Sequence, residues 1–233
     1  MYIMLNSTKK DGNTSLSYGT KEEVLNNRRN FFKKHNIDIK NTLVLRALNE
    51  NKIVEITKEF RDSNKDLSKI ILEADGIVTK EKNIFFYLNF GDCIALSIYD
   101  KRKDVLMLCH LGWHSVKNNL HIIAINYLKE KYNSNVEDLI VELGPSIKKD
   151  SYIMECPIQL GDDAWIKYIE KIDDKNYKVD LNSYVVDGLK NMSIKDIKVS
   201  EIDTYSNNNY YSNYEENKFN LDKGRFIVGA MLK

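Results

Sequence analysis

Cys93 and His110 are the residues whose types and spacing could do chemistry in this chain of 233 residues. A cysteine sulfur and an imidazole can share one metal ion as its ligands. Without a metal, the same two groups can act as a nucleophile and its general base. Either use requires the chain to bring the two side chains together.

A predicted β-hairpin would bring the side chains of Cys93 and His110 together. Residues Ile94–Tyr99 and Val105–Cys109 are rich in β-branched, aromatic and other apolar residues, and the polar segment Asp100–Asp104 separates them. If the hairpin turns about residues 101 and 102, Cys93 lies directly opposite His110. Opposed residues on one face of a sheet have Cβ atoms about 4.5–5.5 Å apart.

The residues around this pair suggest how it is supported. Asp92 could accept a hydrogen bond from His110 and fix its tautomer, as carboxylates do beside catalytic or metal-binding histidines. Ser115 is predicted to cap a helix that follows the turn at Gly112, which places His110 at a strand-to-helix junction suited to an anion. Trp113 is either a core residue or a surface on which a flat aromatic ring could stack.

The rest of the chain predicts an α/β fold, in which mixed β-sheets are flanked by helices. An amphipathic helix is expected over Lys21–His35, followed by strands over Leu43–Leu48, Lys52–Thr57 and, farther along, Leu139–Leu143. We see no repeat and no linker, so residues 1–233 are interpreted as a single domain.

Composition narrows the range of partners. The net charge is +1 and no basic run is present, which argues against a nucleic-acid or membrane-surface partner. No apolar run approaches the length of a membrane span, and no secretory leader is recognisable. Three irregularly spaced cysteines are more typical of a reducing compartment than of a disulfide framework, so a cytoplasmic location is expected.

Several short motifs resemble one known family. They are Asn27-Arg28, Ala74-Asp75, Asp92-Cys93, His110-Leu111-Gly112-Trp113, Gly144-Pro145-Ser146-Ile147, Tyr152 and Gly224-Arg225. In this order they resemble the laccase-domain, or multicopper polyphenol oxidase, family, whose members are described as purine nucleoside phosphorylases. The resemblance implies a zinc enzyme that phosphorolyses adenosine, inosine or methylthioadenosine and deaminates adenosine, with copper named in older descriptions.

The chain departs from the family pattern at some polar positions. The family binds its metal through two histidines and a cysteine; Cys93 and His110 match two of these, and Asn49 stands where the other histidine is expected. His114 replaces an arginine, and could serve as a substitute ligand or contact phosphate. The resemblance also assigns Asn49 and Arg28 to the substrate or phosphate site.

Three functional hypotheses follow. The first is a purine nucleoside phosphorylase with zinc on Cys93, His110 and a third group, acting on a nucleoside and phosphate as a monomer or homodimer. The second is a metal-free hydrolase in which Cys93 is the nucleophile and His110 its base. The third is a divergent paralogue that binds a ligand or partner without turnover. Metal content and the reactivity of Cys93 would separate them.

Overall fold

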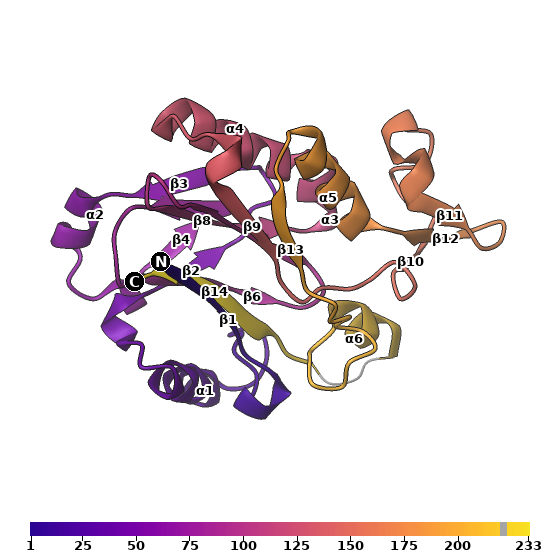
Figure 1. The fold of residues 1–233 in the computed structure, drawn as a ribbon. Coiled ribbons are helices and arrows are strands. Elements are labelled where there is room, and N and C mark those ends of the chain that lie inside the picture. Colours follow the sequence, from indigo (N-terminus) through magenta and orange to yellow (C-terminus); the bar gives the residue numbers. More distant parts are fainter. Residues whose placement is uncertain (220–222) are drawn as a thin grey trace.

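The computed structural model describes residues 1–219 and 223–233. Two large sheets form the body of the protein (Figure 1). The first has five strands in the order β1-β14-β6-β2-β4, with bounds Tyr2–Asn6, Phe226–Leu232, Phe85–Phe90, Thr42–Arg46 and Ile71–Glu73. The second has six strands in the order β13-β9-β7-β8-β5-β3, with bounds Asp196–Val199, Leu139–Leu143, Ile94–Asp100, Val105–Leu111, Gly76–Thr79 and Ile53–Ile56.

The two sheets pack face to face, with helices on their outer faces. Apolar side chains from both sheets, among them Leu43, Phe86 and Val228 from the first and Ile77 and Leu108 from the second, form one buried cluster. A second cluster joins the six-stranded sheet to α4 (Leu120–Tyr132) and α5 (Leu181–Asn191), and a third joins the five-stranded sheet to α1 (Lys21–Lys34). The layers therefore run helix, sheet, sheet, helix, and burial of these apolar faces stabilises the arrangement.

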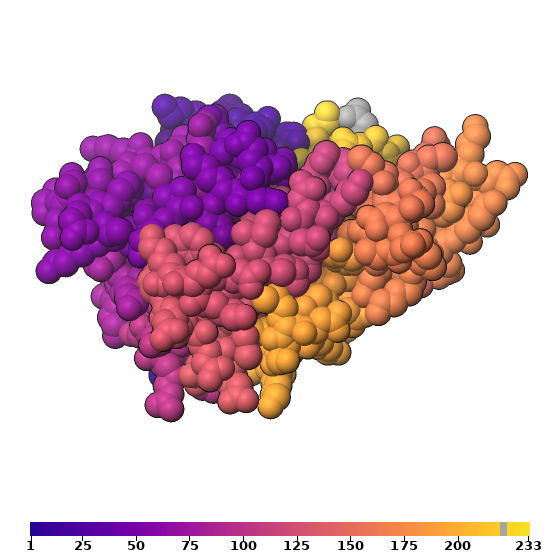
Figure 2. All heavy atoms as spheres, turned by 90° about the horizontal axis from the view of Figure 1, so that it is seen from above, coloured from indigo at the N-terminus to yellow at the C-terminus, as the bar shows by residue number. Residues whose placement is uncertain are grey.

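Both sheets mix parallel and antiparallel pairs, as the α/β prediction required. A third, three-stranded sheet of β10 (Ile153–Glu155), β12 (Asn176–Val179) and β11 (Ile169–Lys171) projects from the body in both views (Figures 1 and 2). The remaining helices are α2 (Lys58–Ser63), α3 (Trp113–Lys117) and α6 (Asn213–Phe219), with short 3₁₀ turns at Lys9–Asp11, Ile39–Asn41, Leu67–Lys69, Val136–Asp138 and Asp163–Tyr168. No helix in the described residues is long and apolar enough to cross a membrane.

The helix after His110 differs from the prediction. It begins at Trp113 rather than after a Ser115 cap, and Ser115 is buried inside α3. Asn119, with a φ of +58°, then interrupts the helix before α4 starts at Leu120. Asparagine tolerates the left-handed conformation because its short side chain is polar and compact. One predicted helix is therefore two, and the first turn stays close to the hairpin.

Candidate functional site

The predicted hairpin is present as β7 and β8, but its register differs by two residues. Asp100 pairs with Val105 and Ala95 pairs with His110, so Cys93 lies across from Gly112. The prediction that Cys93 and His110 lie directly opposite each other was therefore wrong. Side chains alternate along a strand, so a shift of two residues leaves both on the same face. The pair remains close, in a diagonal arrangement.

Gly112 marks the point at which three polar groups converge. A methyl group on its Cα would lie 3.3 Å from Cε1 of His110, 3.5 Å from Sγ of Cys93 and 3.6 Å from Oδ1 of Asn49. The structure thus brings together the cysteine, the histidine and the asparagine that the sequence singled out. A side chain at position 112 would have to share this space, so glycine keeps it open.

Asp75 holds the loop that carries Asn49. Its buried carboxylate accepts hydrogen bonds from the backbone N–H groups of Leu48, Asn49, Glu50 and Lys52, at 2.8, 2.6, 2.8 and 3.2 Å. The backbone carbonyl of Asp75 also accepts the N–H of His110 at 2.7 Å. One residue therefore fixes both the loop and the strand that converge at Gly112.

His110 is held in a neutral form. Burial lowers the pKa of its imidazole to about 4, and the nearby carboxylate of Asp75 opposes this shift only in part. Its Nδ1 atom is buried and has no hydrogen-bond partner among the described residues, and its ring packs 5.4 Å from that of Phe90. A neutral imidazole can accept a proton or bind a metal ion.

Cys93 is held in the thiol form. Burial raises its pKa to about 12, with a further contribution from the negative charge of Asp92. Part of the side chain still faces a pocket. A nucleophilic cysteine needs a lowered pKa, so this environment does not favour the hydrolase hypothesis.

Asp92 does not orient His110, contrary to expectation. Its carboxylate accepts hydrogen bonds from Oγ1 of Thr204 at 2.7 Å, from Oγ of Ser212 at 3.0 Å and from the backbone N–H of Tyr214 at 2.6 Å. Asp92 therefore anchors the segment that leads into α6. Burial raises the pKa of the carboxyl group, while these three hydrogen bonds act in the opposite direction.

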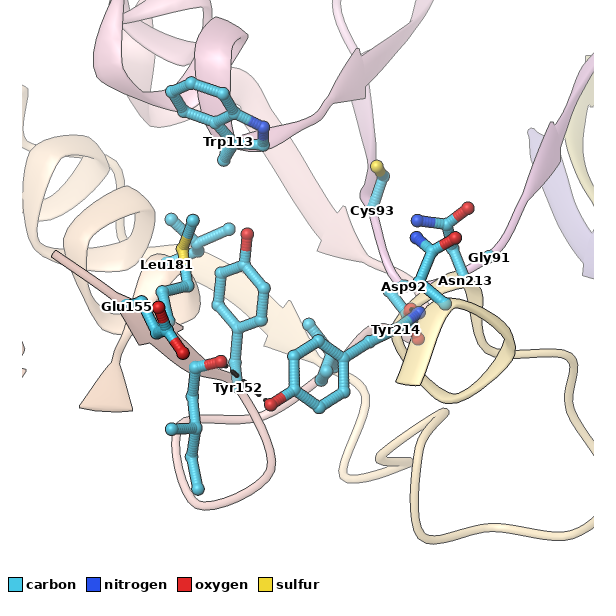
Figure 3. A pocket seen from close by; sticks show the side chains of 13 residues that line it. Gly91, Asp92, Cys93, Trp113, Tyr152, Glu155, Leu181, Asn213 and Tyr214 are labelled. Atoms are coloured by element: carbon cyan, nitrogen blue, oxygen red, sulfur yellow. Dashed lines mark hydrogen bonds between the residues drawn. The ribbon is translucent and has the colours of Figure 1, made fainter. Parts of the chain in front are cut away.

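A pocket of about 360 Å³ opens beside Cys93 (Figure 3). Trp113 and Tyr152 stand across the pocket from the thiol, and Tyr214 closes its lower side in this view. The Tyr214 hydroxyl donates to the backbone carbonyl of Ile153 at 2.8 Å, which ties α6 to the projecting sheet. The pocket thus combines aromatic walls with one thiol.

The other two predicted residues lie elsewhere. His114 is exposed, its ring packs against Trp113, and it does not line the Cys93 pocket, so the structure does not bring it to the Cys93–His110 pair. Arg28, on α1, lines a second pocket together with His110. Arg28 does not line the pocket beside Cys93.

The donor set does not fit a three-ligand metal centre. Catalytic zinc sites use three protein ligands, drawn from cysteine, histidine and carboxylate. Residues 1–219 and 223–233 contain no group of three such side chains placed to hold a metal ion. Asn49 adds only an amide oxygen, which is a weak ligand for zinc. Cys93 and His110 remain two ligands without a third of comparable strength.

Sequence reasoning missed two parts of the site. Tyr214 forms a wall of the pocket, although it follows Cys93 by 121 positions in the chain. Glu155, which also lines the pocket, carried no signal in the sequence. Only the contact between α6 and the projecting sheet reveals them.

The chain matches known proteins in sequence and in fold. The family model described as multi-copper polyphenol oxidoreductase laccase matches residues 7–233. Purine nucleoside phosphorylase YlmD of Bacillus subtilis is 28% identical over 145 residues, which cover 61% of this chain and 52% of that protein. A purine nucleoside phosphorylase of Rickettsia conorii is 29% identical over 194 residues, covering 79% of this chain and 74% of the relative.

The chain therefore spans about half the length of the Bacillus subtilis relative that it matches. Among solved structures, YlmD from Geobacillus stearothermophilus superposes with a TM-score of 0.84 at 18% identity, covering 100% of this chain and 92% of that one. This likeness shows a shared single α/β domain with mixed sheets. The match over residues 7–233 and the shared fold establish that this chain belongs to the multi-copper polyphenol oxidoreductase laccase family.

Proposed function

We propose that this chain is a purine nucleoside phosphorylase whose nucleoside site is the Cys93 pocket. The observation that carries the proposal is the pocket itself, where aromatic rings face a thiol that shares the Gly112 space with His110. Relatives named purine nucleoside phosphorylase support the choice of substrate class. The same relatives support phosphate as the second substrate, because a phosphorylase transfers a group to phosphate.

The pocket suits a purine nucleoside in shape and chemistry. Trp113 and Tyr152 offer flat apolar surfaces on which a purine ring stacks. Glu155 offers a carboxylate that can accept hydrogen bonds from ribose hydroxyl groups. The volume of about 360 Å³ lies within the range of small-molecule sites.

The proposed reaction transfers the ribosyl group from the purine to phosphate. An oxygen of monohydrogen phosphate forms a bond to the ribose C1′ atom, and the bond between C1′ and the purine N9 atom breaks. The electron pair of that bond goes to the purine, which receives the proton carried by the phosphate. Burial holds His110 neutral, and a neutral imidazole has a ring nitrogen that can accept this proton and pass it on. Cys93 contacts the nucleoside as an uncharged thiol.

A metal has a restricted place in this proposal. Zinc, or copper, would bind through Cys93 and His110 and would supply Lewis acidity when present. Since the third strong ligand is missing, we assign no step to it. Deamination of adenosine needs an activated water molecule, and for the same reason we do not include it in the proposed activity.

The test is release of purine base from inosine and adenosine in the presence of phosphate, followed by chromatography. Native protein should release hypoxanthine and adenine, and Cys93→Ala, purified identically, should release at least about tenfold less because the thiol contact is lost. A matched control is Cys156→Ser, which replaces an exposed cysteine outside the pocket and should retain activity. Equal base release by native protein and Cys93→Ala would refute the proposal and favour a ligand-binding role without turnover.

A further inference from the structure

One wall of the Cys93 pocket belongs to the three-stranded sheet that projects from the body. Residues 152–179, which we call the arm, comprise β10, β11, β12 and the 3₁₀ turn Asp163–Tyr168. Four consecutive arm residues, 152–155, line the pocket, and the other lining residues, Cys93 and Trp113 among them, belong to the body (Figure 3). The space available to a nucleoside therefore depends on where the arm lies relative to the body.

An aromatic stack outside the pocket fixes the arm to α5. The indole of Trp165, in the 3₁₀ turn of the arm, stacks on the ring of Tyr184 on α5, with ring centroids 3.8 Å apart and planes 6° apart. Tyr168 packs edge-on against Tyr184 at 5.1 Å, and its hydroxyl donates to Oδ2 of Asp187, also on α5, at 2.9 Å. We call these four residues the clamp. Because Trp165 is only 1% exposed, the clamp is also where the arm joins the apolar core.

The helix that carries half of the clamp also builds part of the pocket. Leu181, the first residue of α5, lines the pocket. Its neighbour Asn182 donates from Nδ2 to the backbone carbonyl of Ile147, another lining residue, at 3.0 Å. Tyr184 follows within the same helical turn. One turn of α5 therefore positions the body side of the pocket and, through the stack on Trp165, the arm side as well.

Other contacts between the arm and the body are weaker than the clamp. Nζ of Lys117 on α3 donates to the backbone carbonyl of Ile158 at 3.3 Å, at an exposed position. The Tyr214 hydroxyl of α6 donates to the backbone carbonyl of Ile153. Each of these contacts is one hydrogen bond that water can replace, whereas the clamp buries an indole ring. The clamp is therefore the contact that most strongly restricts the arm.

We propose that Tyr184 is a positioning residue for the nucleoside, because its stack on Trp165 holds the arm where residues 152–155 can contact the substrate. The identity of the ligand rests on the proposed function. Among the described residues, Tyr184 is not part of the pocket lining, so it acts through the arm and not on the substrate. Without the ring of Tyr184 the arm occupies this position for a smaller fraction of the time, and the affinity for the nucleoside falls by the same fraction.

The experiment is a calorimetric titration of the full chain with inosine, without phosphate, so that no phosphorolysis occurs. Tyr184→Ala removes the stack. Tyr184→Phe keeps the ring and removes only the hydroxyl, which donates to Oδ1 of Asn119 at 2.9 Å. Tyr127→Ala is the matched control, because it truncates another half-buried tyrosine, which lies on α4 with its ring beside that of Tyr132.

A second variant keeps the test decisive if Tyr184→Ala does not fold. Asp187→Ala removes the acceptor of the Tyr168 hydroxyl, at a side chain that is 35% exposed and therefore tolerant of truncation. Circular dichroism and thermal unfolding establish that each variant is folded, and the titrations are made well below every melting temperature.

We expect Tyr184→Ala to bind inosine at least about tenfold more weakly than the native chain, and Asp187→Ala at least about fivefold more weakly. Tyr184→Phe and Tyr127→Ala should stay within about twofold of native, because the stack is intact in both. Native affinity in folded Tyr184→Ala overturns the inference. So does a loss in Tyr184→Phe or in Tyr127→Ala that equals the loss in Tyr184→Ala.

The base-release assay separates positioning from a general structural effect. In Tyr184→Ala the KM for inosine should rise, while kcat and the KM for phosphate stay within about twofold of native, because saturating nucleoside selects the arm position that binds it. A fall in kcat with an unchanged KM for inosine would contradict the positioning role.

These outcomes are separate from the outcome for the proposed function. Inosine binding that depends on Tyr184, in a chain that releases no purine, would support the positioning role and refute the phosphorylase. Purine release with a KM for inosine that Tyr184→Ala does not change would support the phosphorylase and refute the positioning role. A native chain that neither binds inosine nor releases purine would overturn both.

Discussion

Replacing Asp75 with asparagine should destabilise the protein strongly, because both carboxylate oxygens of Asp75 are fully used. Oδ1 accepts the N–H groups of Leu48 and Asn49, and Oδ2 accepts those of Glu50 and Lys52. Whichever way the amide of Asp75→Asn is placed, its NH₂ group faces two backbone donors. Two N–H groups therefore lose their acceptor at a fully buried side chain.

The expected loss of unfolding free energy follows from the number of N–H groups left without an acceptor. Each buried donor left without an acceptor costs about 1–3 kcal/mol, so the variant should lose about 2–6 kcal/mol of unfolding free energy. For a chain of 233 residues, this corresponds to a fall in melting temperature of about 4–24 °C. Urea unfolding followed by tryptophan fluorescence, together with thermal unfolding, measures the loss.

Asp92→Asn is the matched control, since it makes the same change at another buried carboxylate. Among the described residues, Oδ1 of Asp92 accepts only the hydroxyl of Thr204, which can rotate and accept a hydrogen bond from the new amide. Both donors on Oδ2 keep their acceptor, so the loss should be about 1 kcal/mol. A loss below 1 kcal/mol (about the value of one ordinary hydrogen bond) in Asp75→Asn, or an equal loss in both variants, would refute this reasoning.

Three further predictions concern the metal, the thiol and the histidines. Asn49→His should bind zinc at least about tenfold more tightly than the native chain, because the new imidazole completes a Cys-His-His ligand set. Competition with a chromogenic chelator measures this affinity. Equally tight binding by the native chain would show that its own side chains already suffice to bind zinc. The pKa of the Cys93 thiol is about 12, so in a Cys156→Ser background the rate of its alkylation by iodoacetamide should still increase with pH above about 9. A rate that reaches a plateau below about pH 8, where an activated thiol is already ionised, would contradict the raised pKa. Burial lowers the pKa values of His110 and His121 to about 4, so between about pH 6.5 and 4 the unfolded chain takes up protons that the folded chain does not, and the free energy of unfolding should decrease as the pH falls. Urea unfolding at a series of pH values measures this decrease, which should be shallower in His121→Gln. A free energy of unfolding that does not change with pH in the native protein would contradict the lowered pKa values.

The secondary structure near the site was predictable because its signals are local. Apolar runs bounded by polar turns identified β7, β8 and β9, and an amphipathic stripe identified α1. The hairpin register was not predictable from those runs. It depends on a four-residue turn in which the Asp100 carboxylate accepts the backbone N–H groups of Arg102 and Lys103. The length of such a turn is set by side-chain hydrogen bonds that the apolar pattern does not encode.

The site was predictable only where its residues lie in recognisable motifs. Cys93, His110 and Asn49 fall in such motifs, and the structure brings them together at Gly112. The role of Asp92 was not predictable, because its partners Thr204, Ser212 and Tyr214 follow it by 112 to 122 positions. Contacts over such separations depend on how the layers pack, which a single sequence does not show.

The partition of charge between the two pockets was also beyond sequence reasoning. Arg28 was assigned to the substrate or phosphate by resemblance, with no indication of which residues surround it. The fold places it in a pocket that His110 also lines and Glu155 does not. The two pockets therefore differ in charge, since Arg28 and Arg46 line one and Asp92 and Glu155 line the other.

The central claim is that the chain transfers ribose from a purine to phosphate, and the most direct test is the stoichiometry of the products. Inosine and phosphate are incubated with the native chain, and hypoxanthine, ribose 1-phosphate and free ribose are quantified together. The account predicts one ribose 1-phosphate for each hypoxanthine, with no reaction when phosphate is omitted. Free ribose in place of ribose 1-phosphate, or hypoxanthine release without phosphate, would contradict it and identify a hydrolase.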